Sequence, residues 1–329
     1  MKKLAPGSGL FVVGLLLIGT GAWAAPAGAG SRPTAPGLNF LFDKDAFGAP
    51  LAPAAEPARS GLLSRLSVRL YGGFSYAAAA DVNTGAQGFM GYLQLLDAYG
   101  GGTFSGAYRP LHGGFDAGID LVYEITPKIG IGVGAGFIRQ SQSSLATFTS
   151  VAGTGDVMTE AVLSAVPIRL GAFFRTPLAA KFDLTAELGG AYYAGLDFDL
   201  ADHLRYDASN WVETLFSGGG AGASRFGFHG SLGFEYRLSP RTGLFIQVAG
   251  RAAKLGNFST ASEIFNDGAG NSKTTDGKFY LRRETLIDWS YTDLVVRATP
   301  PISDADTVYR EPKFDLTGFS VQIGVRLRL

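Results

Sequence analysis

The 329-residue chain contains no cysteine, which excludes a disulfide scaffold, thiolate metal sites, a cysteine nucleophile and a lipidated N-terminal Cys. Histidine is also rare, and His112, His203 and His229 are too scattered to indicate a metal site. Charged residues make up only 17 % of the chain and the formal net charge is zero, so nothing indicates a nucleic-acid surface. We therefore expect no cofactor and no nucleic-acid partner.

Long apolar runs are missing as well. No stretch approaches eighteen consecutive apolar residues, which excludes a helical membrane protein. Residues 1–24 carry Lys2 and Lys3, an apolar run and a final Ala22-Trp23-Ala24, the order of a secretory signal peptide. Residues 25–61 are rich in Ala, Pro and Gly without periodicity and predict a linker. The remaining residues, 62–329, carry the fold.

Eight runs within residues 62–329 alternate with the period of a β-strand, apolar on one face and polar or small on the other. The final run, Gly318 to Leu329, has an unbroken apolar face. Glycine is abundant, at 47 residues, and often occupies the second face of these runs, which indicates a close-packed β-surface. The runs cover residues 66–76, 115–124, 129–137, 166–175, 182–192, 226–237, 244–252 and 318–329.

The connections between the runs alternate in length. Three are short turns, at residues 126–128, 176–181 and 239–241, and four are long, at roughly 77–113, 139–161, 196–225 and 254–317. Short periplasmic turns and long extracellular loops are typical of outer-membrane barrels. We predict an all-β fold, an eight-stranded antiparallel up-and-down transmembrane β-barrel with long extracellular loops, in the cell outer membrane.

Charged residues of the eight runs lie only on the polar face. An eight-stranded barrel is narrow, so this face fills the lumen, where unpaired charges are costly to desolvate. We predict a paired lumen charge network. Its members are Arg69, Asp116, Asp120, Glu124, Arg169, Arg175, Asp183, Glu187, His229, Glu235, Arg237, Arg251, Arg326 and Arg328.

Aromatic residues of the apolar face collect at two levels when the strands run alternately up and down, as expected of girdles at the two headgroup regions. Eight lie near the long-loop end: Phe74, Tyr76, Phe115, Phe137, Tyr192, Phe226, Phe228 and Phe319. Five lie near the short-turn end: Tyr123, Phe174, Phe182, Phe234 and Tyr236.

Local irregularities lead to three further expectations. Pro167 lies inside a run and lacks the N–H that a strand needs, so we expect a bulge there. Residues 85–100 have apolar residues at helical spacing and predict a helix that caps the mouth or lies at the outer interface. Residues 277–298 have strand-forming composition with charges on both faces, so we expect an extracellular β-extension, with a ten-stranded barrel as the alternative.

Catalytic interpretations are weaker. His229, Ser231 and Glu235 share one face and loosely resemble the His-x-Ser of outer-membrane lipid A deacylases, but Leu232 replaces the expected Asn. Asp116, Asp120 and His229 suggest an omptin-like protease site, although those enzymes have ten strands. The glycine run 130–136 lacks the GxGxxG pattern and a following helix. We predict no enzyme activity and a lumen network in place of each catalytic site.

The eight runs, the stretch AVPIRLGAFFRTPLAAKFDLTAELGGAYYAG from Ala165 to Gly195 and the closing run resemble the small outer-membrane β-barrel superfamily, which includes OmpW-type and OmpX-type proteins. The chain ends in Leu329, where that family commonly has Phe. The resemblance implies a structural or surface-interaction role, or alternatively a conduit for small hydrophobic molecules. Implied partners are outer-membrane lipid, lipopolysaccharide, the barrel insertion machinery, and a small apolar ligand or an extracellular partner at the loops.

Overall fold

A computed structural model describes residues 61–100, 102–150, 153–207, 209–220, 225–256, 258, 260–286 and 289–329. The predicted signal peptide and residues 25–60 of the predicted linker lie outside this part of the chain. In the described part, every helix is too short or too polar to cross a membrane.

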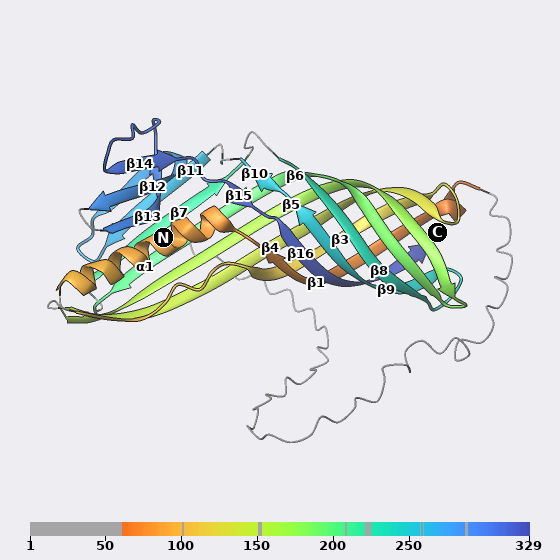
Figure 1. The fold of residues 1–329 in the computed structure, drawn as a ribbon, viewed down its shortest axis with the longest axis horizontal. Coiled ribbons are helices and arrows are strands. Elements are labelled where there is room, and N and C mark those ends of the chain that lie inside the picture. Colours follow the sequence, from red (N-terminus) through yellow and green to blue (C-terminus); the bar gives the residue numbers. More distant parts are fainter. Residues whose placement is uncertain are drawn as a thin grey trace, which may run out of the picture. The chain divides into compact units, whose positions relative to one another are not determined.

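Figure 1 shows that the described residues are almost entirely β-structure. There is one α-helix, α1 (Ala80–Gly100), and a 3-10 turn, η2 (Leu63–Arg65), among the described residues. The strands are β1 (Leu66–Ala77), β2 (Thr103–Gly106), β3 (Gly113–Glu124), β4 (Ile129–Ser150), β5 (Gly153–Ala179), β6 (Phe182–Arg205), β7 (Trp211–Gly219), β8 (Phe226–Arg237), β9 (Thr242–Ala252), β10 (Lys254–Leu255), β11 (Thr260–Asp267), β12 (Ser272–Leu286), β13 (Trp289–Arg297), β14 (Thr307–Arg310), β15 (Phe314–Asp315) and β16 (Gly318–Arg328).

Antiparallel pairing connects eight of these strands in a closed order, which we call the strand ring. The order is β1, β3, β4, β5, β6, β8, β9, β16 and back to β1. Each predicted run lies in one of these strands. The first and last strands are paired along their length, from Ser67 opposite Arg328 to Ala77 opposite Gly318.

The strand ring has its apolar face outside and its charged face inside. Leu170 is 69 % exposed and Ile131 is 50 % exposed, although both lie in the middle of long strands. Asp120, on the opposite face, is only 1 % exposed. A water-soluble sheet protein buries its apolar face, so this distribution is inverted. Strand arginines such as Arg69 and Arg326 are buried on the inner face, whereas a soluble sandwich would have its charged side chains outermost.

The predicted long loops are the main correction to the sequence analysis. Three ring strands continue far beyond the strand ring: β4, β5 and β6 have total lengths of 22, 27 and 24 residues. The same sheet continues with β7, β11, β12 and β13. We call this second region the extension; it also contains β2, β14 and α1. Residues 139–161, 196–225 and 254–317 are therefore largely strand.

The loops were mispredicted because the extension reverses the polarity of the strand faces. On β5, odd-numbered residues point inward throughout, but they change from Arg169 in the ring to buried Leu163 and Val157 in the extension. Even-numbered Glu160 and Asp156 are exposed there. The outward-facing apolar pattern therefore ends where the apolar residues move to the inner face, although the strand itself continues.

The interior of the extension is an apolar core. Four of its large aromatic members, Phe198, Phe258, Phe279 and Phe314, are each at most 1 % exposed and form contacts with ring centroids 4.1 to 6.5 Å apart. Aromatic packing of this kind closes the space inside the extension.

The predicted helix is confirmed as α1, although it begins five residues earlier, and it packs with one face against the extension. Val82, Ala86 and Met90 are buried. Gly85 lies against the side chains of Leu281 and Leu294, so a residue with a Cβ would be crowded at this contact. Helix α1 therefore covers β12 and β13, and residues 277–298 form most of the β-hairpin beneath it.

The irregularity expected at Pro167 is confirmed. The register between β5 and β6 shifts between Val166 and Pro167, because Val166 pairs with Gly195 whereas Pro167 pairs with Tyr193. Ala194 is the additional residue of this bulge. The bulge changes which residues of β6 face inward, from odd-numbered Ala191 and Tyr193 to even-numbered residues beyond it.

Candidate functional site

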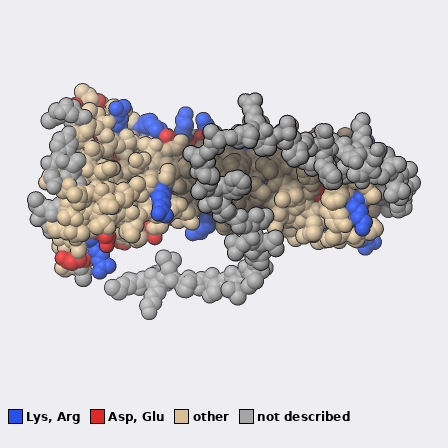
Figure 2. Space-filling view, turned by 60° about the horizontal axis from the view of Figure 1, so that its bottom comes forward, with Lys and Arg blue, Asp and Glu red and all other residues tan. Residues whose placement is uncertain are grey.

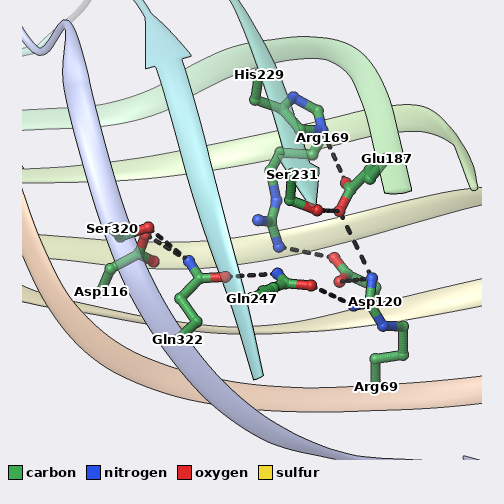
Figure 3. A network of polar contacts seen from close by, with 10 residues as sticks. All are labelled: Arg69, Asp116, Asp120, Arg169, Glu187, His229, Ser231, Gln247, Ser320 and Gln322. Carbon is green, nitrogen blue, oxygen red and sulfur yellow. Dashed lines mark hydrogen bonds and ion pairs between the residues drawn. The ribbon is translucent and has the colours of Figure 1, made fainter. Parts of the chain in front are cut away.

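A buried polar network fills the inside of the strand ring and is the candidate functional site (Figure 3). Period-2 alternation places its side chains there, since every second residue of each ring strand points inward. Of the fourteen residues predicted for the lumen network, eight are buried to at least 91 %. They are Arg69, Asp116, Asp120, Glu124, Asp183, Glu187, Glu235 and Arg326.

Asp120 is at the centre of the network. Its Oδ1 accepts from Arg169 Nη2 at 2.7 Å, and its Oδ2 lies 3.8 Å from Arg69 Nη1. Arg69 also lies 3.5 Å from Glu187, so Arg69 is shared by two carboxylates while Arg169 pairs with Asp120. Charge-assisted contacts of this kind offset the cost of removing the four charged groups from water.

Two aromatic rings contact the Arg69 guanidinium. Its Cζ lies 4.4 Å from the centroid of the Phe245 ring and 5.2 Å from that of Phe173. Arg169 similarly lies 4.9 Å from the Tyr71 ring centroid. Cation–π contacts therefore supplement the carboxylates around these arginines.

A chain of amides links this centre to Asp116. Arg69 donates to Gln247 Oε1 at 2.5 Å, Gln247 donates to Gln322 Oε1 at 2.6 Å, and Gln322 donates to Asp116 Oδ2 at 2.8 Å. Arg251 lies 3.8 Å from the same carboxylate and donates to Ser75 and to the Tyr76 carbonyl. Hydrogen bonds thus connect β1, β3, β9 and β16 across the ring interior.

His229 and Ser231 both contact Glu187. His229 Nε2 lies 2.9 Å from Glu187 Oε1, and Ser231 donates to Glu187 Oε2 at 3.4 Å. In a nucleophilic triad the serine bonds the histidine and the histidine bonds the acid. Here the carboxylate lies between the two, so the hydrogen-bond partner of Ser231 is a carboxylate and not the histidine. Glu235 lies in a different cluster, 2.7 Å from Arg326.

The remaining predicted residues form that second cluster near the short turns. Glu124 Oε1 lies 3.8 to 4.0 Å from Arg175, Arg326 and Arg328. Arg237 lies 3.4 Å from Asp183 in the same region. Residues of this cluster, including Arg175, Glu235 and Arg326, line a cavity at the short-turn end of the ring.

The predicted girdle residues lie on the outer face of the ring in contacting pairs. At the long-strand end Phe115 contacts Phe137, Tyr192 contacts Phe226, and Tyr76 contacts Phe319, with centroids 5.2 to 5.7 Å apart. Tyr76 also stacks on His112. At the short-turn end Phe182 contacts Tyr236 at 5.0 Å. Phe74, Phe228, Phe174 and Phe234 are exposed by 46 to 74 %, and Tyr123 is partly exposed.

The predicted network contains only ionisable groups, and the structure adds several other residues to it. Gln247, Gln322 and Ser320 occupy the same face as the charges, and their position in the alternation was a sufficient signal. Phe173 and Phe245 were missed for a different reason. Each is a single aromatic residue on a polar face, and only the tertiary structure shows that it contacts an arginine.

A separate polar group lies in the extension. Asp202 accepts a hydrogen bond from Thr159 at 2.6 Å. Burial, and to a smaller extent the charge of Asp293, raise the pKa of Asp202 to about 7 against the lowering effect of the Thr159 hydrogen bond. Arg282 donates to Asp293 at 2.6 and 3.1 Å. Burial raises the pKa of Asp293 and the Arg282 contact opposes that rise. Among the residues that the structure describes, no cation lowers the pKa of Asp202 in this way.

In the described part of the chain, no group of three or more His, Asp or Glu side chains has an arrangement that could hold a metal ion. No family model matches the sequence, and no curated protein matches it.

Solved structures do show similarity. The outer membrane protein OprG from Pseudomonas aeruginosa matches with 12 % identity and a TM-score of 0.32, over 79 % of this chain and 94 % of that one. The outer membrane protease OmpT from Escherichia coli matches with 9 % identity and a TM-score of 0.36, over 83 % of this chain and 99 % of that one. At these identities, any functional assignment depends on the residues of the chain itself.

Proposed function

We propose that this chain is an integral outer-membrane β-barrel protein with a structural or surface-interaction role and no catalysis. Its eight ring strands cross the bilayer, and the extension projects to the exterior. The observation that carries this proposal is the inverted polarity of the strand ring. Exposed Leu170 and Ile131 alternate with inward residues such as Arg169, which is stable only where the surrounding solvent is hydrocarbon.

Backbone pairing supports the same proposal. Hydrocarbon cannot hydrogen-bond peptide groups, so a β-structure can cross a bilayer only when its strands close on one another. The eight ring strands pair in a closed order. β1 and β3 have 12 residues each, enough for the 9–11 residues or so that a tilted strand needs in the bilayer.

The extension has the polarity of a domain in water. Its outer face carries Asp156, Glu160 and Arg205, while its apolar residues form a separate core. This change of polarity along continuous strands supports an exterior position, where the extension would meet lipopolysaccharide and extracellular partners.

Conduction of small hydrophobic molecules is less well supported. The ring interior is crossed by ion pairs, and the extension interior is filled by Phe198, Phe279 and Phe314. An eight-stranded ring is also narrow enough for side chains to fill it. Reconstituted protein is expected to give no ion conductance in planar bilayers. The hydrolase alternative lacks a serine–histidine contact at Ser231.

The first test is heat-modifiable gel mobility of outer-membrane fractions. A closed barrel resists unfolding in detergent at room temperature and migrates differently after boiling. Unchanged mobility on boiling would contradict the proposal. Proteolysis of intact cells then tests orientation, because cleavage is expected within the extension and not at residues 125–128 or 238–241.

A matched pair of cysteine variants tests the solvent directly, since the native chain has no cysteine. Leu170 in the ring and Leu145 in the extension have nearly equal exposure, 69 % and 63 %. A spin label at Leu170→Cys is expected to collide mainly with oxygen, which concentrates in lipid. A label at Leu145→Cys is expected to collide mainly with a water-soluble nickel chelate. Equal aqueous accessibility at both sites would exclude a lipid-facing ring.

A further inference from the structure

A repeated pattern occurs at the short-turn end of the strand ring. Four segments there each carry an exposed apolar residue followed three positions later by an exposed cation. The pairs are Leu62 and Arg65, Ile125 and Lys128, Leu178 and Lys181, and Leu238 and Arg241. The four apolar side chains are 70, 48, 57 and 54 % exposed.

Backbone hydrogen bonds join these segments into one rim. Arg175 N–H donates to the Lys128 carbonyl, Arg237 N–H to the Lys181 carbonyl, and Arg328 N–H to the Arg241 carbonyl. Leu329 N–H donates to the Leu66 carbonyl, next to Arg65. The four cations therefore lie at the same level around the ring, and we call these four pairs the basic rim.

Among the described residues, the exposed charged side chains at this end of the ring are all cations. The nearby acids, Glu124, Asp183 and Glu235, are at most 9 % exposed and lie against arginines inside the ring. Among the described residues, the cations of the basic rim form no ion pair with any acid. Figure 2 shows blue Lys and Arg surface at this end, on the right of the view.

The basic rim directly follows the apolar band of the ring. Exposed Phe174 lies four residues before Leu178 of the rim, and exposed Phe182 directly follows Lys181. Phe182 also contacts Tyr236. The outer surface of the ring thus carries three kinds of side chain in order toward the short turns. Aliphatic residues come first, aromatic residues follow, and the apolar residues and cations of the basic rim come last. The same order of groups is found in lipid, from acyl chain to headgroup.

We propose that the basic rim binds anionic phospholipids of the leaflet it meets, with the apolar residue among the acyl chains and the cation on the phosphate. The proposal rests on the membrane-barrel function given above. Anionic membrane surfaces attract Lys and Arg side chains that lie near the headgroups. Four such sites distributed around the ring would enrich the surrounding lipid shell in anionic lipid.

Spin-labelled lipids measure this enrichment. The full exported chain is reconstituted in phosphatidylcholine vesicles, and electron paramagnetic resonance gives the protein-restricted fraction of spin-labelled phosphatidylglycerol and of spin-labelled phosphatidylcholine. The wild type is expected to prefer phosphatidylglycerol by about twofold or more. The variant Arg65→Gln, Lys128→Gln, Lys181→Gln and Arg241→Gln is expected to lower the ratio to near one.

A charge-matched control separates the rim from net charge. Arg205→Gln, Lys273→Gln, Lys278→Gln and Arg283→Gln remove four exposed cations from the extension. This control is expected to keep the wild-type preference. Inorganic phosphate at millimolar concentration is expected to leave the preference unchanged, because a lipid also contributes its acyl chains. Loss of the preference in phosphate would assign the rim to free phosphate and overturn the lipid proposal.

Failure of this proposal is distinguishable from failure of the barrel. A wild type that shifts on boiling but has no preference for phosphatidylglycerol would overturn the basic rim alone. The same follows if the rim variant keeps the full preference. A variant that lacks residues 25–60 gives a further test. If only this variant prefers phosphatidylglycerol, residues 25–60 occupy the basic rim in the full chain and the lipid proposal is wrong. A chain without heat-modifiable mobility would instead overturn the proposed function.

Discussion

Arg169 donates to Asp120 at 2.7 Å although the two residues lie on β5 and β3, which are separated by β4. The residue between them in register is Gly134, which pairs with Asp120 on one side and Arg169 on the other. The absence of a side chain at Gly134 leaves the space in which the carboxylate and the guanidinium meet. The glycine alternation of β4 is thus part of the charge network.

Gly134→Ala is expected to destabilise the protein by roughly 1–3 kcal/mol. A Cβ there would overlap the Asp120 carboxylate and lie 2.8 Å from the Ile119 carbonyl oxygen. Urea unfolding in lipid vesicles measures the change. Gly250→Ala is the control, because a Cβ at Gly250 meets no atom within 4 Å. Equal effects of the two substitutions would show that backbone propensity, and not the network, determines the cost.

Asp120→Ala is expected to cost about 3–5 kcal/mol of unfolding free energy, because it leaves Arg169 and Arg69 buried with less compensating charge. Replacing both partners, Asp120→Leu with Arg169→Leu, is expected to cost less than the sum of the single changes. Additive losses in the same urea experiment would mean that the two side chains do not interact.

The extension is expected to become less stable as pH rises from about 4 to about 7. The folded-state pKa of Asp202, about 7, lies above its unfolded value of 3.8, so the folded state binds the extra proton in this window. That contribution is complete below pH 4 and is lost as pH rises toward 7. The rate of protease cleavage within the extension measures it, and Asp202→Asn is expected to flatten the profile. Exposed Asp276→Asn should keep the wild-type profile, and a flattened profile in that control would contradict the assignment.

His229→Ala is expected to lower the unfolding free energy by roughly 1–3 kcal/mol while leaving any lipid or peptide hydrolysis unchanged, because His229 contacts Glu187 and not Ser231. His229→Gln keeps a hydrogen-bond donor and should recover part of the stability. A hydrolytic activity that disappears in His229→Ala and in Ser231→Ala, with the fold intact, would instead establish an enzyme.

Period-2 alternation determined the ring strands from sequence alone. The positions of Phe74, Leu170 and Ile323 on one face and of Asp120, Glu187 and Arg326 on the other follow from a geometry with only two faces. The break at Pro167 was equally predictable, because proline lacks the N–H that its position in a strand requires.

Tertiary structure alone decided which inward residues meet and what the long connections become. The sequence places Arg169 inside but does not show that it reaches Asp120 past Gly134, because partner choice depends on register between strands distant in the chain. It also does not show that β5 continues through Leu163 and Val157, where the apolar side chains move to the inner face. The alternation of apolar and polar residues shows that a strand has two unlike faces, and only the closed arrangement of strands establishes which face is inside.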